Sequence, residues 1–162
     1  MAPCPLMLTF QRTLEAAIGY VELGMAEEAL QELDSLSPDQ QREAPSLELR
    51  AVVLQQLERW DDAAAVHAEL CRASGASIDR FIGWGCVLYE LGRYDECRSA
   101  LLAAPSEARE HGLWNYHLAC YEILLGNTEA GRQLIRKSLR IEPRLRSMAL
   151  RNENLRPLLE SE

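Results

Sequence analysis

The sequence predicts an all-α protein made of four repeated helical hairpins followed by a C-terminal capping helix. Two observations predict this class: small and apolar residues recur every 34 positions, and apolar residues within each repeat follow helical spacing. No segment carries the alternating apolar pattern of a half-buried strand. The chain has 162 residues, so we expect a single domain over 1–162.

The 34-residue period is clearest at a turn position that holds Gly24, Gly92 and Gly126, with Glu58 in the remaining place. A Leu precedes each of these four residues. Two further columns hold small residues, seven positions before and five positions after the turn: Ala17, Ala51, Gly85 and Ala119, then Ala29, Ala63, Cys97 and Gly131. Helices joined by a short turn must approach closely, so we expect both small columns to be buried, and a bulky side chain there to overpack.

Each repeat is expected to form two helices over 10–43, 44–77, 78–111 and 112–145, with the cap at 146–162. In the third repeat, Phe81 and Leu88 share one apolar helical face before Gly92, and the second helix ends at Pro105. Asn127 is predicted to cap the last long helix, and Pro157 fits the first turn of the final helix. In the first repeat, the second helix is expected to be cut short at Ser37-Pro38. The cap contributes five apolar residues that could cover the last repeat: Met148, Leu150, Leu155, Leu158 and Leu159.

These columns resemble the tetratricopeptide repeat, whose 34-residue pattern runs W-x2-L-G-x2-Y, then G, A-x3-F, A and P. The matching residues are Trp84, Gly85, Leu88, Gly92, Tyr94 and Cys97, followed by Leu118, Ala119, Gly126 and Pro143. The resemblance covers 136 of the 162 residues. It departs at the first aromatic position, which holds Thr13, Leu47, Phe81 and Asn115. The resemblance implies a right-handed α-solenoid whose first helices line a concave groove.

The same resemblance implies which side chains face that groove, at positions 2, 5, 9, 12 and 13 of each repeat. They form an apolar floor with acidic edges, and the candidate partner-binding residues among them are Leu14, Ile18, Glu22, Glu48, Val52, Gln55, Asp79, Ile82, Cys86, Tyr89, Tyr116, Cys120 and Ile123. Exposed apolar concavities mark binding sites, and tyrosine is favoured at interface hot spots. The expected function is a non-catalytic protein–protein interaction scaffold. Its expected ligand is a short apolar, partly basic segment of a partner.

An alternative for the groove is that the N-terminus or the cap of the same chain fills it. The family's carboxylate clamp, which binds acidic chaperone tails, requires Lys at position 5 and Asn at position 9 of a repeat. It is not expected here, because none of the four repeats has this pair. The residues at these two positions are Leu14 and Ile18, Glu48 and Val52, Ile82 and Cys86, and Tyr116 and Cys120. A second functional alternative is a cytoplasmic secretion-type chaperone that holds a hydrophobic client segment in the same concave face.

The charge distribution argues against nucleic acid and membranes as general partners. The net charge is −8, and all of it lies in residues 1–81, with 14 acidic and 6 basic residues. Residues 132–156 form a basic end without interleaved aromatic residues, so stacking on bases is not supported. The longest uncharged stretches, Met1–Gln11 and Gly112–Tyr121, are too short to span a bilayer. No signal peptide is recognised, and we expect a cytoplasmic protein.

The cysteines and histidines offer one enzymatic alternative. Five irregularly spaced cysteines without a C-x-x-C motif indicate free thiols in a reducing compartment. Cys86, His117 and Cys120 could supply soft ligands to a metal, which would allow a thiol- and His-dependent enzyme, but no fourth ligand can be named. His67 occupies a packing column, and Asp61 with Asp62 opens a helix, so both are expected to be structural. We therefore expect no enzyme activity, cofactor or metal.

Overall fold

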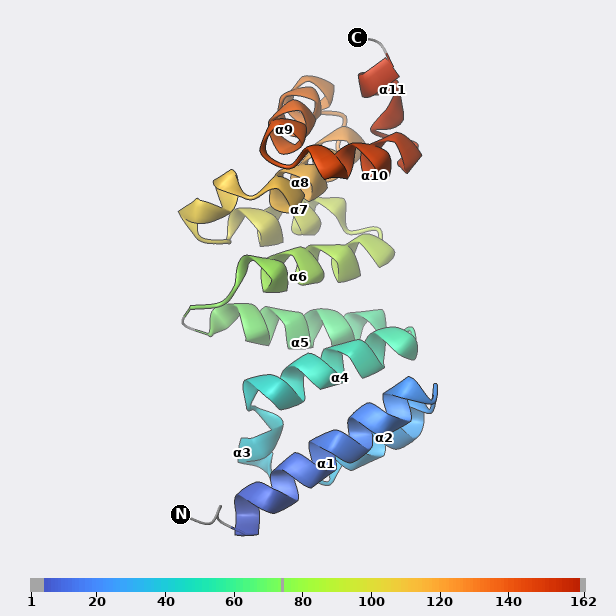
Figure 1. The fold of residues 1–162 in the computed structure, drawn as a ribbon, viewed down its shortest axis with the longest axis vertical. Helices are drawn as coiled ribbons and strands as arrows, with labels where there is room; N and C mark the ends of the chain where they lie inside the picture. The colour runs from blue at the N-terminus through green and yellow to red at the C-terminus, as the bar shows by residue number, and fades with distance from the viewer. Residues whose placement is uncertain (1–4, 74, 161–162) are drawn as a thin grey trace. The chain divides into compact units, whose positions relative to one another are not determined.

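The structure is a computed structural model that describes residues 5–73 and 75–160, with side chains from residue 9 onward. The chain divides into two compact units, Met1–Ala76 and Ser77–Glu162. The described residues form α-helices and short 3-10 helices and contain no strand (Figure 1). The predicted all-α class is therefore confirmed, while a single domain over 1–162 stays a prediction.

Unit 1 contains two long helical hairpins. Helix α1 (Pro5–Glu22) packs on α2 (Ala26–Asp34), and α4 (Ala44–Gln56) packs on α5 (Trp60–Arg72). Between them lies α3 (Pro38–Gln41), whose first turn is closed by a capping box between Ser37 and Gln40. Because α2 ends at Asp34 and α3 starts at Pro38, the interruption predicted at Ser37-Pro38 is confirmed. Helix α4 also contacts α1 and α2, which ties the two hairpins together.

Unit 2 contains the other two hairpins and the C-terminal segment. Helix α6 (Ile78–Glu90) packs on α7 (Tyr94–Leu102), and α8 (Gly112–Leu124) packs on α9 (Thr128–Ile141). The 3-10 helix η1 (Ser106–Glu110) links the hairpins. A second 3-10 helix, η2 (Pro143–Leu145), leads to α10 (Arg146–Arg151) and α11 (Arg156–Glu160). Helix α8 is held by the indole nitrogen of Trp114, which donates to the carbonyl of Leu101 at 3.0 Å.

The 34-residue period of the sequence is also the period of the helices. Helices α4, α6 and α8 begin at residues 44, 78 and 112, as predicted, and the four first helices end at residues 22, 56, 90 and 124. The four second helices begin at residues 26, 60, 94 and 128. Among the helix starts only that of α1 differs, because α1 is already helical at Pro5, ahead of the expected start at residue 10, while the second helices end at different points of their repeats.

The turns between paired helices share one backbone conformation. Gly24, Gly92 and Gly126 have φ values of 73°, 68° and 83°, and Glu58 adopts the same left-handed region with φ of 54°. In each turn the next residue donates its N–H back to a carbonyl of the first helix, as from Arg59 to Leu54 at 2.9 Å. The turn thus imposes a left-handed residue even where the sequence supplies Glu.

Both small-residue columns are buried in all four hairpins, as predicted. Two glycines show how little room there is. A Cβ on Gly131 would lie 2.5 Å from the Cδ1 of Ile123 and 3.2 Å from the carbonyl oxygen of Ala119, and one on Gly85 would lie 3.0 Å from the hydroxyl of Tyr121. The close approach of α9 to α8, and of Tyr121 to α6, therefore depends on the absence of side chains at these positions.

Two local expectations need correction. Asn127 occupies the N-cap position of α9, but its side chain makes no capping bond. It donates instead to Glu122 Oε2 at 2.7 Å, and Arg98 donates to the other oxygen of this buried carboxylate at 2.6 Å. The C-terminal cap is two short helices rather than one, because the chain turns at Asn152 between α10 and α11.

Other cap predictions are confirmed in part. Pro157 lies in the first turn of α11, as predicted. Leu155, Leu158 and Leu159 are buried, whereas Met148 is half-buried and Leu150 is exposed.

Candidate functional site

A hollow in unit 2 is the best-formed candidate site. It has a volume of about 280 Å³ and is lined from α6, α8 and the C-terminal segment, by Cys86, Tyr89, Glu90, Tyr116, His117, Cys120, Tyr121, Met148 and Asn152. Cys86 and Cys120 hold the same place in consecutive repeats, so the repeat itself brings their two helix faces together at this site.

Asn152 connects this hollow to the C-terminal segment. Its Nδ2 lies 3.4 Å from the Tyr116 hydroxyl and 3.6 Å from Cys120 Sγ. Its Oδ1 accepts the backbone N–H groups of Asn154 and Leu155, at 3.0 and 3.2 Å. The same side chain therefore orients groups in the wall of the hollow and closes the turn before α11.

Aromatic rings form the wall between α6 and α8. The ring centroids of Tyr116 and His117 are 5.3 Å apart in an edge-on arrangement, and His117 lies 6.3 Å from Tyr121. Tyr89 lies 6.4 Å from Tyr121 and 5.6 Å from Tyr94. Tyr121 is buried, while Tyr89 is 39% exposed. Tyr89 is therefore the ring of this cluster that a second molecule could contact most readily.

The groups in the wall are uncharged at neutral pH. Burial raises the pKa of Tyr116 and of Cys120 to about 12, and it also raises the pKa of the Cys86 thiol. Burial lowers the pKa of His117 to about 4, so its imidazole is neutral and can meet Cys86 Sγ, which lies 3.8 Å from Nδ1. The exposed Glu90 is the charged residue among those that line the hollow.

Comparison with solved structures identifies the architecture. MamA 41-end from Desulfovibrio magneticus RS-1 superposes with a TM-score of 0.73 at 18% identity, over 94% of this chain and 90% of that one. MamA MSR-1 C2 superposes with a TM-score of 0.71 at 18% identity, over 83% of this chain and 78% of that one. MamA is a helical solenoid of tetratricopeptide type. This chain has the tetratricopeptide fold. No protein-family model and no curated protein sequence matches it.

The tetratricopeptide fold predicts groove residues in unit 2, and the structure places them at different depths. Asp79 and Tyr89 are exposed, and Cys86 and Ile123 are half-buried. Ile82, Tyr116 and Cys120 are buried, so they do not form an open floor. At Tyr116 and Cys120 the chain's own Asn152 occupies part of the predicted groove. This contact is what the alternative of a cap-filled groove predicts, and it involves two of the predicted groove residues, Tyr116 and Cys120.

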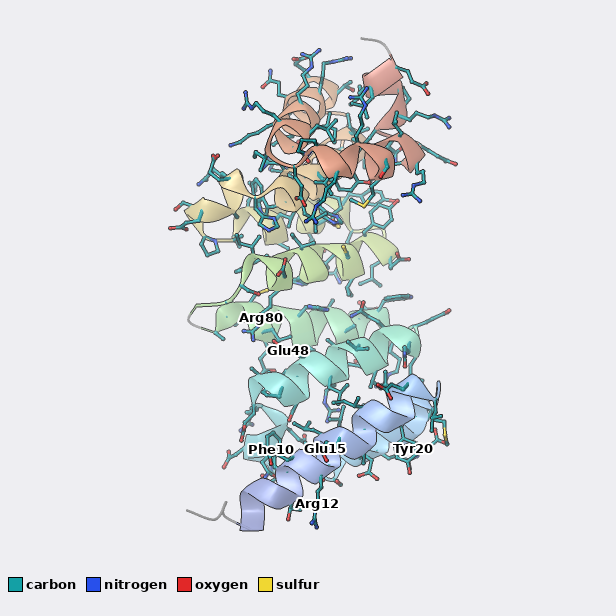
Figure 2. The ribbon with its side chains drawn as sticks, viewed as in Figure 1. Phe10, Arg12, Glu15, Tyr20, Glu48 and Arg80 are labelled. Atoms are coloured by element: carbon teal, nitrogen blue, oxygen red, sulfur yellow. The ribbon has the colours of Figure 1, made fainter. Side chains whose placement is uncertain are left out.

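In unit 1 the corresponding residues are more open. Ile18 and Val52 hold the same place in consecutive repeats and are 46% and 43% exposed. Glu22 and Glu48 are exposed beside them, whereas Leu14 and Gln55 are half-buried. Gln55 is held by its own helix, because its Nε2 donates to the carbonyl of Ala51 at 3.1 Å. Figure 2 shows charged side chains along these helices, including Arg12 and Glu15 on α1 and Glu48 on α4.

Five residues of the hollow lie outside the predicted partner-binding set: Glu90, His117, Tyr121, Met148 and Asn152. Glu90 lies at a predicted groove position, His117 is a candidate metal ligand and Met148 is a predicted cap residue. Tyr121 and Asn152 are therefore the two that no prediction names. Tyr121 follows Cys120 directly, and a tyrosine after a groove position could have suggested it. Asn152 belongs to the C-terminal segment, and nothing in the repeat pattern predicts that it reaches α8.

The metal alternative predicted from Cys86, His117 and Cys120 can be compared with the geometry. Within residues 5–73 and 75–160, no group of three or more His, Cys, Asp or Glu side chains is placed to hold a metal ion. Cys86, Cys97 and Cys120 are free thiols, and Cys4 lies outside the described residues.

The residues predicted to be structural lie mostly as expected. His67 is buried, with its Nε2 3.3 Å from Gln55 Nε2, and Asp62 pairs with Arg59 at 2.7 Å in the first turn of α5. Of the three tryptophans, Trp114 is buried and Trp60 and Trp84 are half-buried. None of the described helices combines the length and apolar character needed to cross a bilayer.

Proposed function

We propose that the chain is a non-catalytic protein-interaction scaffold. Its binding surface consists of the groove-facing residues of the first helices, and its ligand is a short apolar, partly basic segment of a partner protein. The observation that carries the proposal is the repeated exposure of apolar side chains at groove positions: Ile18 and Val52 in unit 1 and Tyr89 in unit 2. Ile18 and Val52 occupy one register of consecutive repeats, and Tyr89 lies at a second predicted groove position, three residues after the register of Ile18 and Val52. Exposed apolar side chains at predicted groove positions of both units favour a contact surface over chance exposure.

The charges beside these residues favour a partner with Lys or Arg. Glu22 and Glu48 are exposed in unit 1, and Asp79 and Glu90 are exposed in unit 2. A basic side chain next to an apolar anchor would meet a carboxylate in either unit. An acidic tail would be repelled, which also argues against the carboxylate-clamp type of ligand.

Affinity capture from the native cell extract tests the proposal. The bait pair is the wild-type chain and the Val52→Glu/Tyr89→Ala double variant, checked for unchanged helicity by circular dichroism. The variant should lose the partners that the wild type captures, because both side chains are exposed and belong to the predicted groove positions.

A matched control is available within the chain. Leu102 and Ile141 are 44% and 37% exposed, nearly the same as Val52 and Tyr89, but they lie on second helices. The Leu102→Glu/Ile141→Ala variant should capture the wild-type partners at the wild-type yield. If the groove variant captures the same partners as this control, the binding surface is not the one proposed.

A further inference from the structure

The hollow in unit 2 supplies a defined anchor site, and its chemistry specifies what it can accept. We infer that it receives one aromatic side chain of a partner peptide, and that a neighbouring Lys or Arg of that peptide lies over Glu90 and Tyr89. This inference rests on the proposed function and narrows it to a short feature of the partner's sequence.

The size of the hollow fits one aromatic ring. A cavity of about 150 Å³ lined by apolar side chains is large enough to bind benzene. The hollow has about 280 Å³ and opens between α6, α8 and the segment that carries Met148 and Asn152. A phenyl ring therefore fits with room for its Cβ.

The lining favours an uncharged ring over a polar or charged group. The thiols of Cys86 and Cys120 are protonated and His117 is neutral, because each is desolvated. A charged side chain deep in the hollow would lose its hydration, and Glu90, the charged lining residue, is exposed and could pair only with a cation at the edge. A ring can instead extend the edge-on and tilted contacts that Tyr116, His117 and Tyr121 already make at 5.3 and 6.3 Å.

The rim of the hollow favours a cation beside that ring. Glu90 follows Tyr89 at the C-terminal end of α6, and both side chains are exposed. A Lys or Arg there gains the carboxylate of Glu90, the face of the Tyr89 ring and the negative end of the helix. A carboxylate at the same place would be repelled by all three. The rim therefore distinguishes Phe-Lys from Phe-Glu.

Three short Gly- and Ser-based peptides test this inference on the full chain: one with Phe-Lys at its centre, one with Ser-Lys and one with Phe-Glu. Amide chemical shifts in a ¹⁵N spectrum report the affinity up to millimolar concentration. The Phe-Lys peptide should shift residues 86–90 and 116–121 and bind about tenfold more tightly than either matched peptide. Equal binding of the Ser-Lys peptide, or no binding of the Phe-Lys peptide, overturns the inference.

Alkylation of Cys86 locates the bound peptide independently. Cys86 lines the hollow, whereas Cys71 lies on α5 and serves as the internal control. The Phe-Lys peptide at saturation should slow maleimide labelling of Cys86, measured by mass spectrometry, and leave that of Cys71 unchanged. Peptide binding without protection of Cys86 contradicts the anchor site. It does not contradict the proposed scaffold function, because affinity capture with the Val52→Glu/Tyr89→Ala variant tests that function separately.

The Glu90→Gln variant tests the cation site without a risk to folding, because this side chain is exposed. It should weaken binding of the Phe-Lys peptide about three- to tenfold and reduce the difference between Phe-Lys and Phe-Glu, because only the Tyr89 ring and the helix end then still favour the cation. An unchanged preference for Phe-Lys contradicts the placement of the cation over Glu90.

Discussion

The left-handed conformation of Glu58 leads to a quantitative prediction about stability. Three of the four hairpin turns place Gly at the residue with positive φ, and the second hairpin places Glu58 there with φ of 54°. This conformation costs a residue with a Cβ about 1–2 kcal/mol. Replacement by Gly removes that cost. It also lowers the free energy of the unfolded chain by about 0.5–1 kcal/mol through added backbone entropy, which offsets part of the gain. Glu58→Gly should therefore stabilise the fold by about 0.5–1 kcal/mol.

The reciprocal substitution provides the control. Gly92 has φ of 68° and open space around its Cα, so Gly92→Glu meets no steric clash and isolates the backbone cost. It should destabilise the fold by about the amount that Glu58→Gly stabilises it.

Urea unfolding followed by far-ultraviolet circular dichroism measures both variants, and thermal unfolding should show shifts of about 2–4 °C per kcal/mol. A loss of stability in Glu58→Gly, or no cost in Gly92→Glu, would refute the claim that all four turns share one backbone conformation.

Two further predictions concern packing and pH. Ala119→Leu should lower the free energy of unfolding in urea by about 1–3 kcal/mol, because α9 packs directly on Ala119. Ala130→Leu, at an exposed position of α9, should lower it by less than about 0.5 kcal/mol. Equal losses in the two variants would contradict the close packing. Burial lowers the pKa of His117 from 6.5 to about 4, so the unfolded chain takes up its proton first as the pH falls. The free energy of unfolding should therefore fall by about 2 kcal/mol, through this residue, as the pH is lowered from 7 to 5. His117→Gln should lose that part of the pH dependence, and an identical pH profile for the variant would show that the imidazole is not desolvated.

The repeat pattern predicts the scaffold because its constraints are local. A turn of fixed conformation and two small columns determine each hairpin, and the backbone repeats at residues 58, 92 and 126 whether Glu or Gly is present. Burial of all eight small residues follows from the same close approach of paired helices.

The depth of the groove residues could not be predicted in the same way. Tyr116 and Cys120 share a groove register with open positions in other repeats, but Asn152 covers them from a segment outside the repeat. That contact depends on where the chain turns after α10, which the 34-residue period does not encode. The hollow between Tyr89 and Asn152 arises from this contact, so its walls could be only partly predicted from the first helices.

The proposed binding mode requires a partner segment to lie against Tyr89. A photoreactive benzoylphenylalanine placed at Tyr89 tests this most directly, with the same group at Leu102 as a control of similar exposure on a second helix. Irradiation in the native extract should link position 89, and not position 102, to a segment in which an aromatic residue adjoins Lys or Arg. Equal linkage from both positions, or linkage of position 89 to an acidic segment, would contradict it.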